Sequence, residues 1–206
     1  MNKVVRKIQN QDVVLHFYST MEISVCKLVT FCDASFANLP NGGSQGSYIS
    51  FLIDHNGSYC PITWQSRKIR RVVKSTLAAE CLAAVEAAEM TIYLAHFVKD
   101  ILRLSKDSVK TLILCDNNSL VNAVHSSTNL EDKRLIIDIS VLRDLVNRGE
   151  LDEFRWVNTK LQIANSLTKS GACDKELLKI LNEKLFIDYH TASFIVKGTG
   201  GDYFFC

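Results

Sequence analysis

The chain of 206 residues carries 24 Lys and Arg against 22 Asp and Glu, a formal net charge of +2, and 47% of its residues are hydrophobic. This ordinary globular composition supplies a core and suits one domain of about 100–200 residues with short extensions. Nine Gly and two Pro exclude a collagen-like or linker-dominated chain. Because no apolar run reaches the ~20 residues of a membrane span and the N-terminus lacks a secretory apolar stretch, we expect an intracellular protein with no membrane partner.

The seven cysteines are odd in number, and no two of them form a Cys-x-x-Cys pair. A secreted disulfide framework would have an even and denser set, and a structural zinc site usually needs close pairs. We therefore expect free thiols in a reducing compartment.

The first half of the chain predicts strands after a short lead-in. Residues 1–24 mix charge with short apolar pieces and are expected to have no core of their own. VCKLVTFCDASF predicts a first strand, GSYISFLID a second and YCPITWQS a third, separated by the turn signals LPNGG and HNG. The expected structure is an antiparallel meander of three strands.

The pattern then alternates between helix and strand. Apolar residues spaced by three and four predict an amphipathic helix that ends near Leu104, with Ser75 or Thr76 as its N-cap. The remaining predicted elements are a buried strand over 111–116, a short helix over 117–125, a helix over 132–148 that Gly149 ends, a fifth strand over 153–158, and helical pieces over 162–169 and 174–184.

This order of elements restricts the fold. Three meander strands followed by helix–strand alternation require an α/β domain whose five-stranded mixed sheet is flanked by helices. We expect the strand order 3-2-1-4-5, with only the meander antiparallel. The domain is expected to span residues 25–184, and residues 185–206 form a C-terminal extension of unassigned role.

Three acidic residues occupy corresponding places in this pattern. Asp33 ends the first strand, Asp116 ends the fourth, and Glu80 lies in the second turn of the long helix. If the first and fourth strands are neighbours, these carboxylates converge and repel one another unless a cation neutralises them. Carboxylate oxygens favour hard cations, so we expect Mg²⁺ or Mn²⁺, and two such ions suit phosphodiester hydrolysis.

Six sequence motifs in order carry a family resemblance. CDASFA, GGSQGSYISFL, ITWQSRK, STLAAE, LCDNNSLV and QIANSLTK together resemble the ribonuclease H domain of copia-type long-terminal-repeat retrotransposons. The resemblance covers about Leu28 to Lys169 and includes the basic helix segment DKRLIIDISVLRD. It implies a ribonuclease H-like fold, Mg²⁺- or Mn²⁺-dependent hydrolysis of the RNA strand of RNA/DNA hybrids, and a reverse transcriptase domain as partner in the parent polyprotein. The segment NKVVRKIQNQDVVLHFYS resembles the chain that leaves such a reverse transcriptase, and no Tyr-x-Asp-Asp polymerase motif occurs.

The resemblance also assigns the catalytic positions and shows one departure. Asp33, Glu80 and Asp116 match three of the family's four metal-binding carboxylates, and the fourth is the Asp of an A-D-x-L-T-K motif. Here that position is Asn165. An amide keeps an acceptor oxygen but loses the charge that helps to hold a metal and orient water. The sequence leaves two origins open, which are decay of the element and a substitution introduced to stop cleavage.

A basic cluster precedes the predicted catalytic helix and consists of Arg67, Lys68, Arg70, Arg71 and Lys74. It predicts a phosphate-binding surface, and Lys133 and Arg134 add a second possible phosphate site. Gly46 and Ser47 are expected to allow close approach of an RNA strand, and Trp64 and Trp156 are expected in the core. The predicted substrate-binding residues are Gly46, Ser47, Arg67, Lys68, Arg70, Arg71, Lys74, Ser75, Thr76, Lys133 and Arg134.

Three functional interpretations follow. The first is a ribonuclease H that acts during retrotransposon reverse transcription in the cytoplasm, a virus-like particle or the nucleus. The second is a module that binds RNA/DNA hybrid but cleaves it weakly because of Asn165. The third is a non-enzymatic remnant whose carboxylates never meet around a metal. An integrase-like or exonuclease member of the same fold is disfavoured by the order of the six motifs.

Overall fold

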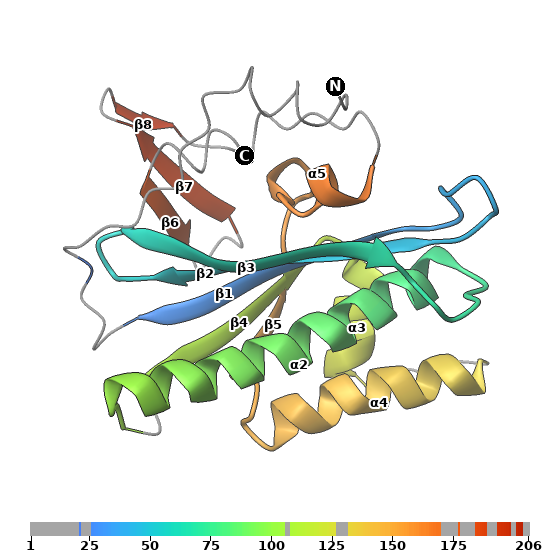
Figure 1. The fold of residues 1–206 in the computed structure, drawn as a ribbon, viewed down its shortest axis with the longest axis horizontal. Helices are drawn as coiled ribbons and strands as arrows, with labels where there is room; N and C mark the ends of the chain where they lie inside the picture. Colours follow the sequence, from blue (N-terminus) through green and yellow to red (C-terminus); the bar gives the residue numbers. More distant parts are fainter. Residues whose placement is uncertain are drawn as a thin grey trace, which may run out of the picture.

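The fold is taken from a computed structural model of the chain (Figure 1). It describes residues 21, 26–105, 108–126, 132–169, 177, 184–188, 193–198 and 201–203. The predicted lead-in over 1–24 therefore lies outside the described residues except for Met21.

A five-stranded sheet forms the centre of the molecule, in the order β3-β2-β1-β4-β5. Its strands pair antiparallel within the meander, whereas β1 with β4 and β4 with β5 pair parallel. The predicted strand order and directions are confirmed. The strands are β1 (Lys27–Ser35), β2 (Gln45–Ile53), β3 (Tyr59–Lys68), β4 (Lys110–Cys115) and β5 (Glu153–Trp156).

Three helices cover one face of this sheet (Figure 1). They are α2 (Thr76–Leu102), α3 (Asn118–His125) and α4 (Lys133–Asn147). The N-cap residues of these helices are Ser75, Asn117 and Asp132. Each of their side chains accepts a hydrogen bond from a backbone N–H group in the first turn of its helix. Gly149 follows α4 with φ of +68°, a conformation that glycine adopts without steric cost.

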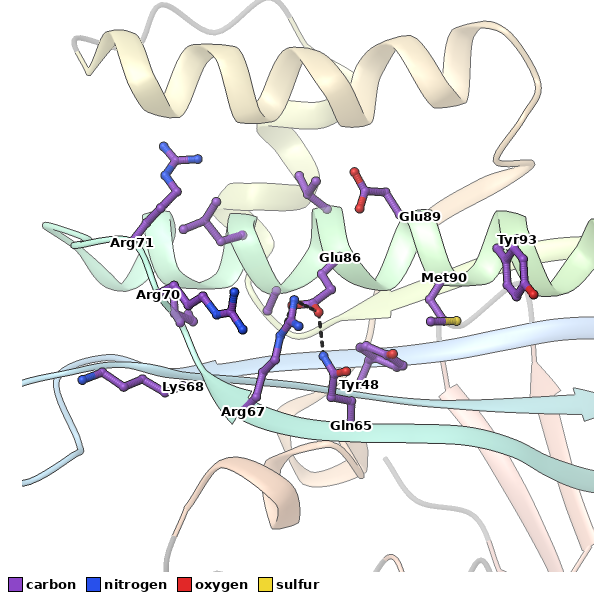
Figure 2. Close-up of a pocket in the computed structure, with 14 residues that line it drawn as sticks. Tyr48, Gln65, Arg67, Lys68, Arg70, Arg71, Glu86, Glu89, Met90 and Tyr93 are labelled. Carbon is purple, nitrogen blue, oxygen red and sulfur yellow. Dashed lines mark hydrogen bonds and ion pairs between the residues drawn. The ribbon is translucent and has the colours of Figure 1, made fainter.

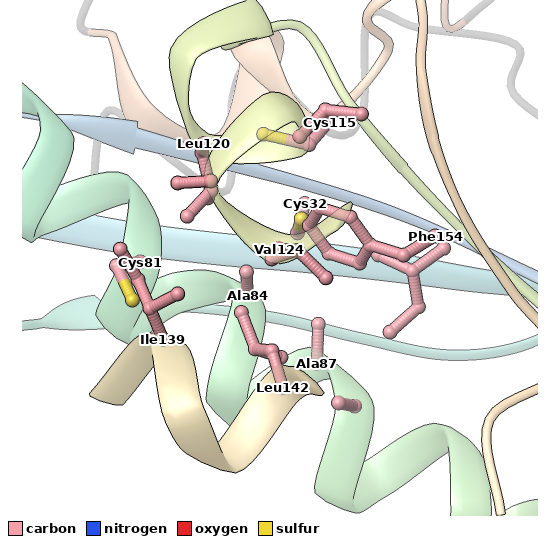
Figure 3. Close-up of a cluster of buried hydrophobic side chains, with 14 of the residues drawn as sticks. Cys32, Cys81, Ala84, Ala87, Cys115, Leu120, Val124, Ile139, Leu142 and Phe154 are labelled. Carbon is pink, nitrogen blue, oxygen red and sulfur yellow. The ribbon is translucent and has the colours of Figure 1, made fainter. Parts of the chain in front are cut away.

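The apolar core is divided between the two faces of the sheet. On the helix-covered face, Cys32 and Ile113 pack against Ala84 of α2 and Ile139 of α4 (Figure 3). On the opposite face, Phe31 and Phe51 pack with the segment that follows β5. Every one of these side chains is at most 4% exposed. Both faces of the central strands are therefore buried, as the near-continuous apolar runs of a parallel pair require.

Helix α2 is long and apolar enough, by length and composition alone, to cross a membrane. The sequence expectation that no apolar run reaches that length therefore differs from this finding. In the structure α2 packs along the sheet, with Ala84, Ala87 and Ala88 fully buried against the strands. These small side chains let the helix lie close to the sheet, which explains the apolarity of α2 as that of a core helix.

The predicted helix over 162–169 is wrong in extent. A 3₁₀ turn η2 (Thr159–Leu161) and a four-residue helix α5 (Asn165–Thr168) form instead, and Gln162 between them is extended with ψ of 90°. The physical reason is the Gln162 side chain, which enters the sheet and donates to the carbonyl of Cys32 at 2.9 Å. A continuous helix would not hold that amide in place.

The C-terminal region contains a second, smaller sheet. The strands β6 (Lys184–Asp188), β7 (Ser193–Gly198) and β8 (Gly201–Tyr203) pair antiparallel in that order. The predicted helical piece over 174–184 falls almost wholly outside the described residues, and its last residue begins β6.

The expectation that both tryptophans belong to the core is wrong for Trp64. This side chain is 55% exposed because β3 is an edge strand and Trp64 lies at the margin of the sheet. Trp156 is half-buried, and its indole N–H donates to the carbonyl of Asp116 at 3.0 Å. Trp156 thus holds the backbone at the end of β4.

The burial pattern predicts a large loss of stability for one aromatic truncation and a small loss for another. Phe51 is fully buried and makes edge-to-face contacts with Phe31 at 6.3 Å and Tyr59 at 5.6 Å between ring centroids. We expect Phe51→Ala to lower the free energy of unfolding by about 3–5 kcal/mol because it leaves a cavity. Trp64→Ala should cost less than about 1 kcal/mol. Urea denaturation of both variants tests this, and equal decreases would contradict the assignment of the core.

Candidate active site

The site begins at the parallel pairing of β1 with β4. In this register Cys32 lies opposite Cys115, so the residues that follow them, Asp33 and Asp116, lie at the same end of the parallel pair. Asp116 follows the end of β4, but Asp33 does not end β1 as predicted, because β1 continues to Ser35 through its pairing with β2. Glu80, in the second turn of α2, comes to this edge from the helix-covered face. The pairing therefore brings together three carboxyl groups that are distant in the sequence.

One carboxylate oxygen each of Glu80 and Asp116 and the Sγ of Cys115 all lie within 4.8 Å of one another. Asp33 is not part of this group of three, but its carboxyl and that of Asp116 are close enough for mutual repulsion. The acidic motifs gave no indication that Cys115 belongs to this group. Successive side chains of a strand point to opposite faces, so Cys115 is expected to point away from Asp116.

Burial and like charge disturb the acidity of this group. The pKa of Glu80 is raised to about 10, chiefly by burial and also by the neighbouring Cys115, Asp33 and Asp116, while a hydrogen bond from the backbone amide of Ala34 acts in the opposite direction. Oε2 of Glu80 has no hydrogen-bond partner among the described residues, although the side chain is only 5% exposed. An unpartnered buried carboxylate oxygen of this kind is costly unless a cation or proton satisfies it.

The second buried carboxyl belongs to Asp33, which is 2% exposed. Its pKa is raised to about 6, because burial and the nearby Asp116 outweigh the opposing effects of a hydrogen bond from Thr168 and the charge of Lys169. Oδ2 of Asp33 accepts that bond from the Thr168 hydroxyl. The donor set of carboxylate oxygens around an unsatisfied buried oxygen fits a hard divalent cation such as Mg²⁺ or Mn²⁺.

Residues 161–169, called the closing segment below, seal the face of the sheet beside Asp33. Gln162 donates to the carbonyls of Cys32 at 2.9 Å and Leu114 at 3.4 Å, and so it bridges β1 and β4 directly below the site. Ser47 donates to the carbonyl of Ala164 at 3.0 Å. Sequence reasoning missed the roles of Gln162 and Thr168, and their position inside the QIANSLTK motif is the only signal for them in the sequence.

Asn165 lies in α5 within the closing segment, half-buried. Its amide nitrogen donates to the carbonyl of Thr159 at 3.2 Å, and its Oδ1 accepts from Nζ of Lys169 at 2.6 Å. Both ends of the amide are thus engaged, the nitrogen by Thr159 and the oxygen by Lys169. A carboxylate at this position would pair with the same ammonium group.

The predicted basic cluster is exposed and lies beside a groove of about 490 Å³ between β3 and α2 (Figure 2). Arg67 forms an ion pair with Glu86, which also accepts from Gln65 at 2.6 Å. Lys68, Arg70 and Lys74 form no ion pair within the described part of the chain. These three cations are therefore available to an external anion.

Lys133 and Arg134, the second predicted phosphate site, lie near the basic cluster, because Arg134 and Lys74 line the same small pocket. Arg71 forms an ion pair with Asp138 of α4 at 2.9 Å, and this contact connects the basic cluster to α4. Lys133 is exposed on the first turn of α4, and Ser75 and Thr76 are exposed at the start of α2.

The remaining predicted substrate contacts, Gly46 and Ser47, are buried. A Cβ at Gly46 would lie 3.3 Å from the Cβ of Ala83, so the absence of a side chain serves the close packing of β2 against α2. Ser47 is turned inward to bond the closing segment. The structure gives both residues a packing role rather than a place on the exposed surface.

The sequence matches no protein-family model, and no curated protein matches it either. Solved ribonuclease H structures are similar in fold. The N-terminal RNase H domain of a Mycobacterium tuberculosis protein is 14% identical, with a TM-score of 0.51 over 69% of this chain and 90% of that chain. RNase H1 of Halobacterium salinarum is 16% identical, with a TM-score of 0.50 over 73% of this chain and 97% of that chain.

A third similar structure is LC11 RNase H1 in complex with an RNA/DNA hybrid, 16% identical with a TM-score of 0.51 over 73% of this chain and 99% of that chain. At these identities the likeness establishes the fold alone. The protein has a ribonuclease H-like fold, an α/β sheet in the order 3-2-1-4-5 with flanking helices.

The raised pKa of Asp33 predicts a pH-dependent cost in the metal-free protein. The pKa of Asp33 is about 6 in the folded protein and 3.8 in the unfolded chain, so the folded state binds this proton more tightly. The resulting contribution to the free energy of unfolding is fully present below pH 3.8 and is lost as the pH rises through 6. We expect Asp33→Asn to increase the free energy of unfolding at pH 7.5 in EDTA by roughly 1–3 kcal/mol and to have little effect near pH 4.

Urea denaturation at the two pH values measures this difference. Asp144→Asn is the matched control, because that carboxyl is 52% exposed in an ion pair with Arg148. An Asp33→Asn effect of the same size at both pH values would show that burial does not strain this carboxyl.

Proposed function

We propose that this chain is a hydrolase of the ribonuclease H type, whose reaction is divalent-cation-dependent cleavage of the RNA strand of RNA/DNA hybrids, and that Asn165 reduces its activity. The observation that carries the proposal is the convergence of Glu80 and Asp116 within 4.8 Å, beside Asp33, with a buried and unpartnered Glu80 oxygen. Carboxyl groups held together at this cost to stability are typical of a functional site rather than of a core.

Glu80, Asp116 and Asp33 would hold the cations. When bound, Mg²⁺ or Mn²⁺ supplies the positive charge that activates water and stabilises the leaving oxygen of a phosphodiester. The protein's own part is rigidity: Gln162 ties β1 to β4 beneath the site, and the indole of Trp156 holds the carbonyl of Asp116. Water is the nucleophile and the bond between phosphorus and the 3′-oxygen breaks, so hydrolysis leaves a 3′-hydroxyl and a 5′-phosphate without a covalent intermediate.

The exposed basic residues support a nucleic-acid substrate. Lys68, Arg70 and Lys74 are free of ion pairs within the described chain and precede the helix that carries Glu80. Cations so placed can position a phosphate backbone across the site. A hybrid is the favoured substrate because LC11 RNase H1, which shares the fold, is solved in complex with an RNA/DNA hybrid.

We further propose a retrotransposon context, which rests on the six copia-type motifs. The foamy viral protease-reverse transcriptase, solved in complex with an RNA/DNA hybrid, supports a place beside a polymerase: it is 13% identical with a TM-score of 0.50 over 77% of this chain and 21% of that chain. A reverse transcriptase domain is then the partner, residues 25–184 form the hydrolase domain, and the cytoplasm, a virus-like particle or the nucleus is the place of action.

A second candidate function is a module that binds hybrid without cleaving it efficiently. Asn165 favours it, since its neutral amide is held by Thr159 and Lys169 and contributes no charge to a second cation. Hybrid affinity depends mainly on Lys and Arg contacts to phosphates, so the missing carboxylate would impair binding less than turnover.

The substitution Asn165→Asp separates the two candidates. We expect the unmodified chain to cleave a labelled RNA/DNA duplex poorly or not at all in Mg²⁺, and Asn165→Asp to raise the rate at least about tenfold, equivalent to ~1.4 kcal/mol of barrier. The added carboxylate restores the charge missing from the fourth position. A gel assay on the duplex measures the rate, with Asp116→Asn in both backgrounds as the inactive control.

Two outcomes would contradict this expectation. Full activity of the unmodified chain would show that Asn165 does not occupy a required ligand position. Inactivity of both proteins, with hybrid binding retained, would identify the binding module, and the absence of binding as well would indicate a remnant.

The basic cluster predicts a steep dependence of hybrid affinity on salt. Removing one cation that binds a phosphate should reduce the slope of log K against log[salt] by about one. We expect this reduction for Arg70→Ala, because Arg70 is exposed and forms no ion pair within the described part of the chain. The matched control is Arg67→Ala, which should change the slope less because Arg67 is paired with Glu86.

Fluorescence anisotropy with a labelled hybrid at several salt concentrations gives these slopes. Arg71→Ala should give an intermediate result, since Arg71 also binds Asp138. An unchanged slope in the Arg70 variant would move the substrate surface to another face of the domain.

A further inference from the structure

A thiol stands inside the proposed cation site, and hydrolysis with hard cations has no use for it. Sγ of Cys115 lies within 4.8 Å of carboxylate oxygens of both Glu80 and Asp116. Cys115 is fully buried, and its sulfur accepts a weak hydrogen bond from the amide of Asn117 at 3.5 Å. That amide belongs to Asn117, the N-cap residue of α3.

Two further observations indicate that this group of three can accept a ligand. Oε2 of Glu80 is buried and has no partner within the described residues. Asp116 is only half-buried, so the group has one side through which an ion can arrive from solvent. A buried acceptor without a donor, beside a thiol and a second carboxylate, is an incomplete coordination shell.

We infer that Cys115, Glu80 and Asp116 form a site for a thiol-binding divalent cation of the Zn²⁺ class, and that this ion competes with Mg²⁺ or Mn²⁺ for the shared carboxylates. Binding replaces the thiol proton by a metal–sulfur bond and releases that proton to solvent, with no change in oxidation state. Asp33 stays outside the site. The inference goes beyond the proposed hydrolase, in which only oxygen ligands take part.

The geometry and the ligand chemistry favour zinc over magnesium at these three atoms. Donor atoms around a tetrahedral zinc lie about 3.3–3.8 Å apart, so groups already within 4.8 Å need only small side-chain movements. Mg²⁺ demands six oxygen ligands in octahedral geometry and does not bind thiolates, whereas Zn²⁺ accepts one sulfur with two oxygens and a water. The thiol therefore adds affinity for one class of cation only.

The test uses Co²⁺, a spectroscopic substitute for Zn²⁺, on the whole metal-free chain without nucleic acid. A thiolate-to-cobalt charge-transfer band should appear, saturate at one ion per chain and disappear when Zn²⁺ is added. Cys115→Ser should abolish the band and weaken Zn²⁺ binding in calorimetry at least about tenfold. Cys60→Ser is the matched control, because it removes a thiol outside the site and should leave the band unchanged.

A second measurement needs no variant. X-ray absorption of the zinc-loaded wild-type chain should show one sulfur neighbour at about 2.3 Å. A shell of oxygen and nitrogen only, or an undiminished band in the Cys115 variant, would overturn the inference. Because neither readout requires cleavage, inactivity of both the unmodified chain and Asn165→Asp on hybrid would refute the proposed hydrolase without removing the metal site.

Discussion

The parallel pairing of β1 with β4 is the constraint on which the candidate site depends. It sets Cys32 against Cys115, and through that register it brings Asp33 and Asp116 to one edge of the sheet. Buried carboxyl groups repel one another, so backbone hydrogen bonds and the apolar core must hold this edge together against the repulsion. Gln162 reinforces the pairing by bonding carbonyls of both strands.

The closing segment and α2 hold the site from opposite faces. Helix α2 supplies Glu80, and a closely packed face of small residues allows it to approach the strands. The closing segment supplies Thr168, which bonds Asp33, and Asn165, which holds Lys169 near that carboxyl. The charge of Lys169 thus acts where the proposed hydrolase lacks a fourth carboxylate.

Cys115 changes which metal ions the site can bind. Carboxylates alone select hard cations, but a thiol within 4.8 Å of two of them adds a soft ligand. The odd set of cysteines without close pairs gave no indication of a metal site, because the three ligands come from α2 and from the end of β4. Only the sheet register and the helix position bring them together.

The sequence by itself determined the strand order, the helix starts at Ser75, Asn117 and Asp132, and the elements that carry the three acidic residues of the site, because local periodicity, turn chemistry and motif order carry this information. The tertiary structure alone decided that Gln162 stays outside the helix predicted over 162–169, which begins only at Asn165, and that Ser47 and Gly46 are buried. Contacts between residues more than thirty positions apart depend on the completed sheet, and no local pattern encodes which side chain will satisfy a carbonyl or leave an oxygen without a partner.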